Sequence, residues 1–185
     1  MSIPDPPIGP PAPPLTTTRW FNTPSPPTLD ALRGQVVVIE AFQMLCPGCV
    51  SHGLPQAQRI QRHFGGDAAV LGLHTVFEHH EAMRPVSLEA FLHEYRIDFP
   101  VGVDAHETPN GRPVTMTAYG LQGTPSLVVL DRLGRIRLHA FGHAEDLAVG
   151  AAIARLIDEP LPEPEPAAAT CTTAGCTLDQ TKDHR

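Results

Sequence analysis

The stretch EAFQMLCPGCVSHGLPQ, residues 40–56, places Cys46 and Cys49 two residues apart behind an apolar run. The residues leading into it, 36–42 (VVVIEAF), are mostly β-branched or apolar and predict a buried strand. Pro47 suits the first turn of a helix, because its missing N–H would be unpaired there. We therefore expect Cys46 to lie between the end of a strand and the start of a helix.

This position favours redox chemistry of the cysteine pair. A helix N-terminus has unpaired N–H groups and a partial positive charge, and both stabilise a thiolate, the form that attacks disulfides. The spacing lets the pair close a small disulfide ring, so we expect an exposed Cys46 to attack and a more buried Cys49 to resolve. A structural zinc site would need two further ligands, and the sequence has no second Cys-x2-Cys pair. No metal ligands and no cofactor are expected.

Composition argues against several classes of partner. The 185-residue chain has a formal charge of −7 and no run of basic residues, which argues against nucleic acid. No apolar stretch approaches the length that spans a bilayer, so no membrane partner is expected. The first residues, MSIPDPPIGPPAPPL, lack the basic and apolar regions of a secretory signal, and we expect a cytoplasmic protein. In that compartment four cysteines indicate catalysis, redox sensing or metal binding rather than structural disulfides.

The distribution of proline divides the chain into three parts. Residues 1–19 are proline-rich and are expected to form an extended arm, which Trp20 and Phe21 attach to the domain. Residues 20–158 carry the apolar patterns of one domain. Residues 159–185 alternate proline with small and polar residues, which is typical of a tail.

Apolar periodicity and turn signals predict further helices and strands in the domain. Helices are expected at residues 57–64, 87–97 (with Ser87 as its cap) and 144–159, and strands at 68–76, 99–104, 126–131 and 135–141. Strands that alternate with helices and end in a hairpin predict an α/β fold with a central mixed sheet and helices on both faces.

Four segments carry a resemblance to a known family. They are the lead into the first strand (LDALRGQVVVIEAF), the CPGC motif, the later segment YGLQGTPSLVVLDRLGRI and the entry arm RWFNTPSP. Together the chain resembles the thioredoxin superfamily over about residues 18–158, and within it the TlpA-like thiol–disulfide oxidoreductases. The resemblance implies a thioredoxin-like fold. It also implies that Pro125 is a cis proline opposite the dithiol, and that the backbone of Thr124 pairs with an extended substrate segment.

Glu40 interrupts the apolar strand six residues before Cys46. A buried carboxylate is costly unless it is paired or protonated, so its pKa should rise. Beneath the dithiol it could take the proton of Cys49 and return it, and the resemblance implies this role, since many thioredoxins have an acidic residue here. The alternative is a side chain that faces outward near an edge of the sheet.

Two departures from the family pattern affect the site. Leu45 stands where the family usually has tryptophan, a residue that often shapes the substrate surface. Pro55, next to Gly53, comes one residue later than usual, which suggests a local shift or bulge in the helix.

Other cysteine and histidine clusters leave alternatives open. The segment Glu78–Glu81 (EHHE) favours a solvated loop over a metal site, and His52 favours a surface position. The tail pair, Cys171 and Cys176, could exchange with the dithiol as a redox relay, hold a metal between chains, or remain inert.

We therefore expect a thiol–disulfide oxidoreductase that reduces protein or small-molecule disulfides and is regenerated by an external reductant. A copper- or zinc-binding module on the same fold and a peroxidase-like redoxin are the alternatives. The sequence lacks the Pro-x3-Thr/Ser-x2-Cys pattern of a peroxidase and the Cys-x3-Cys spacing of copper-delivery domains. Nothing in the sequence indicates the oligomeric state.

Overall fold

Strand β2 (Val36–Phe42) forms the centre of the sheet, and all of its residues are buried. The structure is a computed structural model and describes residues 7–161. Strand β2 pairs in parallel with β3 (Ala68–His74) and antiparallel with β5 (Ser126–Leu130). A strand covered on both faces needs apolar residues at nearly every position, which explains why its sequence is a continuous apolar run.

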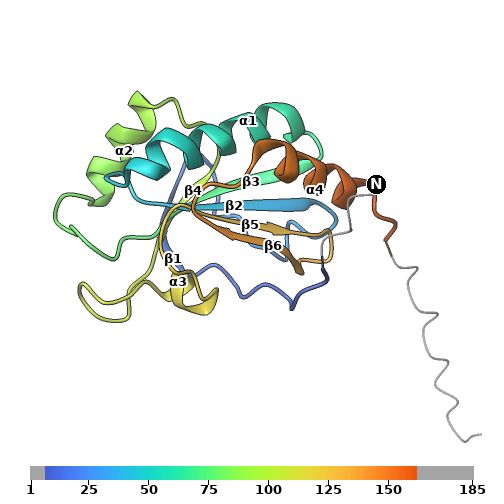
Figure 1. The fold of residues 1–185 in the computed structure, drawn as a ribbon. Helices are drawn as coiled ribbons and strands as arrows, with labels where there is room; N and C mark the ends of the chain where they lie inside the picture. Colours follow the sequence, from blue (N-terminus) through green and yellow to red (C-terminus); the bar gives the residue numbers. More distant parts are fainter. Residues whose placement is uncertain (1–6, 162–185) are drawn as a thin grey trace, which may run out of the picture.

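Six strands form one mixed sheet in the order β1-β4-β3-β2-β5-β6 (Figure 1). The remaining strands are β1 (Thr17–Phe21), β4 (Val101–Asp104) and β6 (Ile136–Phe141). Strands β2, β3 and β4 run parallel, whereas β1, β5 and β6 each pair antiparallel with their neighbours. The predicted α/β architecture with a mixed sheet is confirmed.

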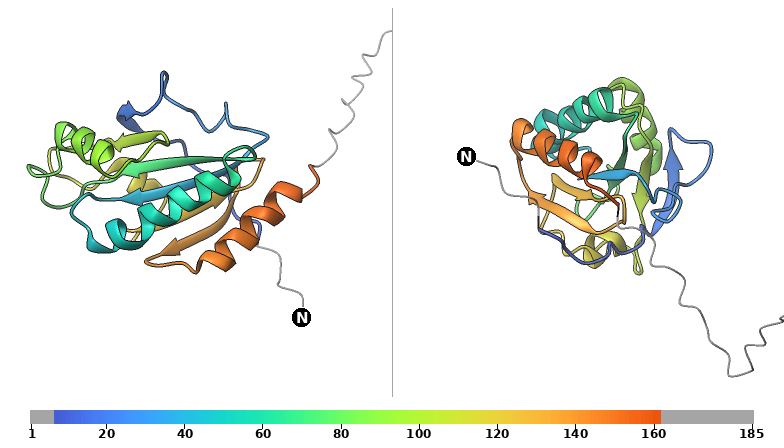
Figure 2. Two further views of the ribbon diagram at one scale, coloured as in Figure 1. Left: turned by 90° about the horizontal axis from the view of Figure 1, so that it is seen from above. Right: turned by 90° about the vertical axis from the view of Figure 1, so that its right-hand side faces the viewer.

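Helices cover both faces of the sheet (Figures 1 and 2). Helices α1 (Leu54–Phe64), α2 (Pro85–Glu94) and α4 (Asp146–Asp158) lie on one face, and the short α3 (Val114–Ala118) lies on the other. The side chains of alternate residues of β2 lie on opposite faces of the sheet. Val36, Val38 and Phe42 pack under α1, α2 and α4, and Val37, Ile39 and Ala41 pack on the α3 side.

Several elements differ from the sequence-based expectation. Strand β1 and helix α3 were not expected, and both are only five residues long, too short for a periodic apolar pattern. Helix α2 begins at Pro85 with Arg84 at its N-cap, so the expected cap at Ser87 is wrong, because proline takes the first helical turn. Helix α1 begins at Leu54, three residues before the expected start.

The proline-rich arm is extended and is hydrogen-bonded along the domain from Pro7 onward. The Gly9 N–H donates to the Ile136 carbonyl at 2.9 Å, and the Ile136 N–H donates to the Pro10 carbonyl at 2.9 Å. The Tyr119 hydroxyl donates to the Pro13 carbonyl at 2.7 Å. Prolines lack the N–H but keep the carbonyl, so they can still accept hydrogen bonds at a sheet edge.

The boundary expected at residue 20 therefore falls inside strand β1. Phe21 packs on the α2 side of the sheet and Trp20 on the α3 side.

Of the expected tail, only residues 159–161 are described, and Cys171 and Cys176 lie outside the described residues. Within residues 7–161, no helix combines the length and the apolar character that a membrane crossing requires.

Candidate active site at the dithiol

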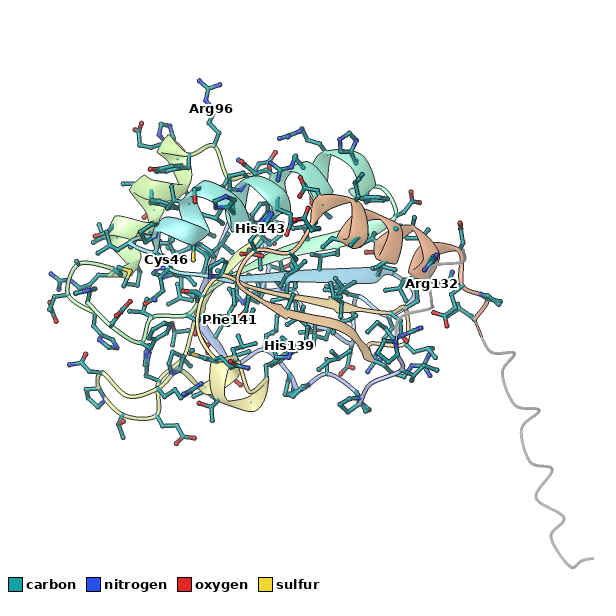
Figure 3. The ribbon with its side chains drawn as sticks, in the orientation of Figure 1. Cys46, Arg96, Arg132, His139, Phe141 and His143 are labelled. Carbon is teal, nitrogen blue, oxygen red and sulfur yellow. The ribbon has the colours of Figure 1, made fainter. Side chains whose placement is uncertain are left out.

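Cys46 of the CPGC motif lies where β2 leads into the helix (Figure 3), and Cys49 is the first residue of the turn that follows. Cys46 is half-buried and Cys49 is fully buried, and both thiols are free. The Cys49 N–H donates to the Cys46 sulfur at 3.2 Å. The Val50 N–H donates to the Cys46 carbonyl at 3.1 Å, which closes the first turn. The structure thus places Cys46 at a helix start, where its sulfur accepts a hydrogen bond from a backbone N–H group.

The helix does not begin as an ordinary α-helix. Residues Cys49–Gly53 form a π-helical turn, and α1 continues from Leu54. A π turn accommodates one extra residue and is frequent at functional sites. This turn accounts for the position of Pro55, which the sequence places one residue later than the family pattern. The local bulge that the late proline suggested is present.

Glu40 lies beneath this turn. Its side chain is 1 % exposed, and its position in β2 between Val38 and Phe42 points it to the helix side of the sheet. A Cβ added at Gly53 would lie 2.2 Å from Glu40 Oε1, so the glycine allows the carboxyl to approach the helix backbone. The alternative of an outward-facing residue near an edge is wrong, because β2 is the buried central strand.

Burial raises the pKa of Glu40 well above its ordinary value, and the negative charge of Cys46 raises it further. Glu40 Oε1 is buried without a hydrogen-bond partner. An unpaired carboxyl in this setting holds its proton to a higher pH than an exposed acid does. It is therefore a group that can accept and return a proton at a higher pH than an exposed acid can.

The two thiols differ in their electrostatic surroundings. Burial raises the pKa of Cys49 to about 12, and the hydrogen bond with the Cys46 side chain also raises it. Hydrogen bonds from the Gln43 backbone and the Thr124 side chain act in the opposite direction and lower the pKa of Cys49. Cys49 therefore stays protonated until a base removes its proton.

The second half of the site is the loop before β5. The Thr124–Pro125 peptide bond is cis. The Cys46 thiol donates to the Thr124 carbonyl at 3.4 Å. A Cβ added at Gly48 would lie 3.2 Å from Pro125 Cδ, so the turn between the cysteines packs against the proline ring. The structure thus brings Cys46, Cys49, Glu40, Thr124 and Pro125 together.

Apolar side chains border the dithiol on the surface. Leu45 is 56 % exposed and Phe141, at the end of β6, is 55 % exposed. A Cβ added at Gly123 would lie 2.9 Å from the Phe141 ring, which places that ring beside the loop of Thr124. Sequence reasoning singled out Leu45 but missed Phe141, because only strand pairing brings β6 beside this loop.

Gln43 is a second residue that sequence reasoning missed. It is 1 % exposed and follows β2 directly. Its carboxamide bonds to the Thr124 hydroxyl and to the Phe77 N–H. The available signal was a polar residue placed directly after a fully buried strand, since such a side chain needs partners.

The histidine segment 78–81 and His52 do not form a metal site with the dithiol among the residues that the structure describes. Within residues 7–161, no three side chains of His, Cys, Asp or Glu are grouped so that they could hold a metal ion. From the segment 78–81, His80 packs edge-on to the His106 ring at 5.5 Å. His52 lies on the surface of the π turn, 5.0 Å from the ring of His143.

Solved structures of several proteins are similar to this chain. One of a protein from the thioredoxin-like superfamily is 57% identical, covers 82% of this chain and 99% of that chain, and has a TM-score of 0.79. One of a thiol-disulfide isomerase from Corynebacterium glutamicum is 47% identical, covers 79% of this chain and 95% of that chain, and has a TM-score of 0.75. The structure of a secreted disulfide oxidoreductase of Mycobacterium tuberculosis is 16% identical in sequence and covers 76% of this chain and 93% of that chain. It shares the fold, with a TM-score of 0.57. No family model and no curated protein matches the chain.

Proposed function

This chain belongs to the thioredoxin-like superfamily, and we propose that it is a thiol–disulfide oxidoreductase that reduces disulfides with Cys46 and Cys49. One observation carries the proposal: an accessible thiol and a fully buried thiol share a hydrogen-bonded turn above a buried acid. This asymmetry suits a two-step exchange, in which one sulfur meets the substrate and the other stays protected until it is needed.

In the first step the Cys46 thiolate attacks a substrate disulfide. A bond forms between the Cys46 sulfur and one substrate sulfur, the substrate disulfide breaks, and the leaving thiolate takes a proton from solvent. The Cys49 N–H, which donates to the Cys46 sulfur at 3.2 Å, stabilises the thiolate before the attack. The product is a mixed disulfide between Cys46 and the substrate.

In the second step Cys49 resolves the mixed disulfide. Its thiol, with a pKa of about 12, needs a base, and the Glu40 carboxylate beneath the π turn accepts the proton. The Cys49 sulfur then bonds to the Cys46 sulfur, the bond between Cys46 and the substrate breaks, and the second substrate sulfur leaves as a thiolate that takes a proton from Glu40 or solvent. The dithiol has given two electrons to the substrate, and an external thiol reductant in the cytoplasm restores it.

The substrate edge is proposed to lie along Thr124, Pro125 and the exposed Leu45. The Thr124 carbonyl faces Cys46, so an extended segment that pairs with this backbone would present its sulfur to the nucleophile. Leu45 supplies an exposed apolar surface on the other side of Cys46. Such a site favours a flexible, disulfide-bearing peptide or a small disulfide.

The test is the redox equilibrium of the purified full chain in glutathione buffers, with all thiols quantified by alkylation and mass spectrometry. We expect a reversible Cys46–Cys49 disulfide in the wild type, insulin reduction that depends on both cysteines, and a trapped mixed disulfide in Cys49→Ser. Cys171→Ser with Cys176→Ser shows whether the tail pair takes part as a relay. A dithiol that never forms, with metal that co-purifies instead, would replace this proposal with the metal-binding module. Peroxide consumption that requires Cys46 alone would replace it with a peroxidase.

A further inference from the structure

The carboxamide of Gln43 connects three segments around the dithiol. Its Oε1 accepts the Phe77 N–H at 3.2 Å, and its Nε2 donates to the Thr124 hydroxyl at 3.4 Å. The backbone carbonyl of Gln43 accepts the Cys46 N–H at 3.2 Å. The side chain is 1 % exposed, so water has almost no access to these groups.

The direction of these hydrogen bonds is determined by the backbone. A backbone N–H can only donate, so the Phe77 N–H requires the carboxamide oxygen on its side. The carboxamide nitrogen must then face Thr124, and an amide nitrogen can only donate. The Thr124 oxygen is therefore held as an acceptor. Because a hydroxyl has one proton, that proton is left for the other neighbour of Thr124, the Cys49 sulfur.

The surroundings of Cys49 agree with this direction. Thr124 lies against the dithiol, because its carbonyl accepts the Cys46 thiol at 3.4 Å. Hydrogen bonding from its side chain lowers the pKa of the Cys49 thiol, opposing the larger effect of burial. The chain of donors thus runs from Phe77 through Gln43 and Thr124 to Cys49. Each hydrogen bond points its proton toward the sulfur on which negative charge develops during the resolving step.

We propose that Gln43 is a positioning residue, which fixes the Thr124 hydroxyl so that its proton stabilises the Cys49 thiolate as Cys49 attacks the mixed disulfide. The inference rests on the proposed function, since it concerns the second step of the dithiol reaction. Gln43 touches neither the substrate nor the reacting sulfurs with its side chain. Its effect should therefore appear in the resolving step and not in the attack by Cys46.

A two-phase reaction with Ellman's reagent separates the two steps. The reagent disulfide and the Cys46 thiolate form a mixed disulfide and release one thionitrobenzoate, at a rate proportional to the reagent concentration. Cys49 then forms the Cys46–Cys49 disulfide and releases the second thionitrobenzoate, at a rate independent of that concentration. Its proton goes to Glu40 or solvent. The full chain with Cys171→Ser and Cys176→Ser serves as the background, so that only the dithiol reacts.

We expect Gln43→Met to slow the second phase at pH 7 about fivefold, the size of one typical intramolecular hydrogen bond, and to shift its pH profile upward. The first phase should change less than twofold. Thr124→Val should slow the second phase as Gln43→Met does, and Thr124→Ser, which keeps the hydroxyl, should restore the rate of that phase. The double variant Gln43→Met/Thr124→Val should be no slower than the slower single variant, because both remove the same hydrogen bond to sulfur.

Gln56→Met is the matched control, since Gln56 is also a buried glutamine (4 % exposed) but bonds to Ala144 and Asp146 instead. It should leave both phases unchanged. Gln43→Met that slows both phases equally, or effects of Gln43→Met and Thr124→Val that multiply, would overturn the positioning role and leave the dithiol function standing. A wild type that shows no second phase would remove the dithiol function and this inference together.

Discussion

Glu40 is an acid placed at a position where every neighbour in the strand is apolar and buried. Its carboxyl approaches the helix only because Gly53 has no side chain. A neutral residue at this position would pack more favourably, since an ionised carboxyl in this setting is costly. The acid therefore lowers the stability of the fold, and this cost fits the proton transfer that we propose for it at the dithiol.

Glu40→Gln should show this conflict between stability and chemistry. Because the folded protein raises the pKa of Glu40, the wild type is most stable where the acid is protonated in both states and loses stability as the pH rises above its ordinary value. The variant has no such titration. Urea unfolding of the reduced protein should show Glu40→Gln gaining on the wild type as the pH rises above 4.5, while its resolving step becomes slower. A stability difference that does not change with pH would contradict the assignment.

His74 is a buried base with the opposite pH dependence. It is 1 % exposed, both ring nitrogens lack partners, and its ring packs 5.3 Å from that of Phe42. Burial lowers its pKa from 6.5 to about 4. Because the unfolded chain binds the proton at a higher pH than the folded protein does, acid lowers the free energy of unfolding. The loss begins as the pH falls below 6.5 and continues until the pH reaches about 4.

His74→Leu should therefore remove an acid-sensitive contribution of about 3 kcal/mol between pH 7 and pH 4, at about 1.4 kcal/mol for each pH unit. Chemical unfolding of both proteins at pH 7 and pH 4 measures it. His93→Gln, on a histidine whose side chain is 86% exposed, is the control and should titrate like the wild type. If the wild type and His74→Leu lose the same stability on acidification, buried His74 is not the cause.

At the scale of elements, the π turn is the feature on which the site geometry depends. The turn places Gly53 over Glu40 and against Pro125, where an added Cβ would lie 2.2 Å from Glu40 Oε1 and 2.9 Å from Pro125 Cβ. Both atoms belong to residues held in the buried interior of the site. Any side chain at this position must displace one of them.

Gly53→Ala should destabilise the protein by about 1–3 kcal/mol, as overpacking of a core does, even though alanine favours helical backbone. Gly150→Ala in α4 is the matched control, since nothing lies within 4 Å of its added Cβ, and should stabilise by about 0.5–1 kcal/mol. Urea unfolding of both variants gives the comparison. Equal effects of the two substitutions would show that the π turn does not hold Gly53 against the carboxyl.

The elements that could be predicted from the sequence are those that carry their own signal. Strand β2, its neighbour β5 and the dithiol between strand and helix follow from continuous apolar runs and from the CPGC motif. Helix α3 could not be predicted, because its start is stabilised from outside. The buried Asp104 carboxylate of β4 accepts the N–H groups of Thr115 at 2.8 Å and Met116 at 3.0 Å.

The residues of the candidate site differ in the same way: some have a local signal in the sequence, and others depend on distant partners. Cys46, Cys49, Glu40 and the Thr124–Pro125 pair could be located from local sequence and from the family resemblance. The partners of Gln43 could not, because Thr124 lies 81 residues away along the chain and Phe77 lies 34 away. Side-chain networks that join distant loops leave only one trace in the sequence, a polar residue in a buried position.

At the scale of the whole molecule, the dithiol and the two ends of the described chain lie at opposite ends of the sheet. Cys46 lies just beyond the carboxyl end of β2. The arm pairs with the start of β6, beside the β5–β6 turn at the other end of the sheet, where Figure 3 labels Arg132. There the buried Arg137 donates to the Pro7 carbonyl at 3.2 Å and pairs with Glu159 at 2.5 Å. The arm and the end of α4 are thus attached to the same guanidinium, far from the reacting sulfurs.

Removal of residues 1–13 should therefore lower stability without changing the chemistry of the dithiol. The truncated chain loses five hydrogen bonds of the arm, and we expect a loss of about 5 kcal/mol, at about 1 kcal/mol for each bond; the residues are Pro7, Gly9, Pro10, Ala12 and Pro13. Tyr119→Phe, which removes only the bond to Pro13, should cost about 1 kcal/mol. The uncovered edge of β6 should also promote self-association, measurable by light scattering.

The rate at which Cys46 reacts with Ellman's reagent should stay within twofold of the wild type in the truncated chain, measured well below its unfolding midpoint. The reason is that the dithiol turn is held by β2, α1 and the Thr124 loop, none of which contacts residues 7–13 through a described hydrogen bond. A rate that falls together with stability would show that the arm transmits its packing along the sheet to the active site. In that case the division of the molecule into a stabilising end and a reactive end would be wrong.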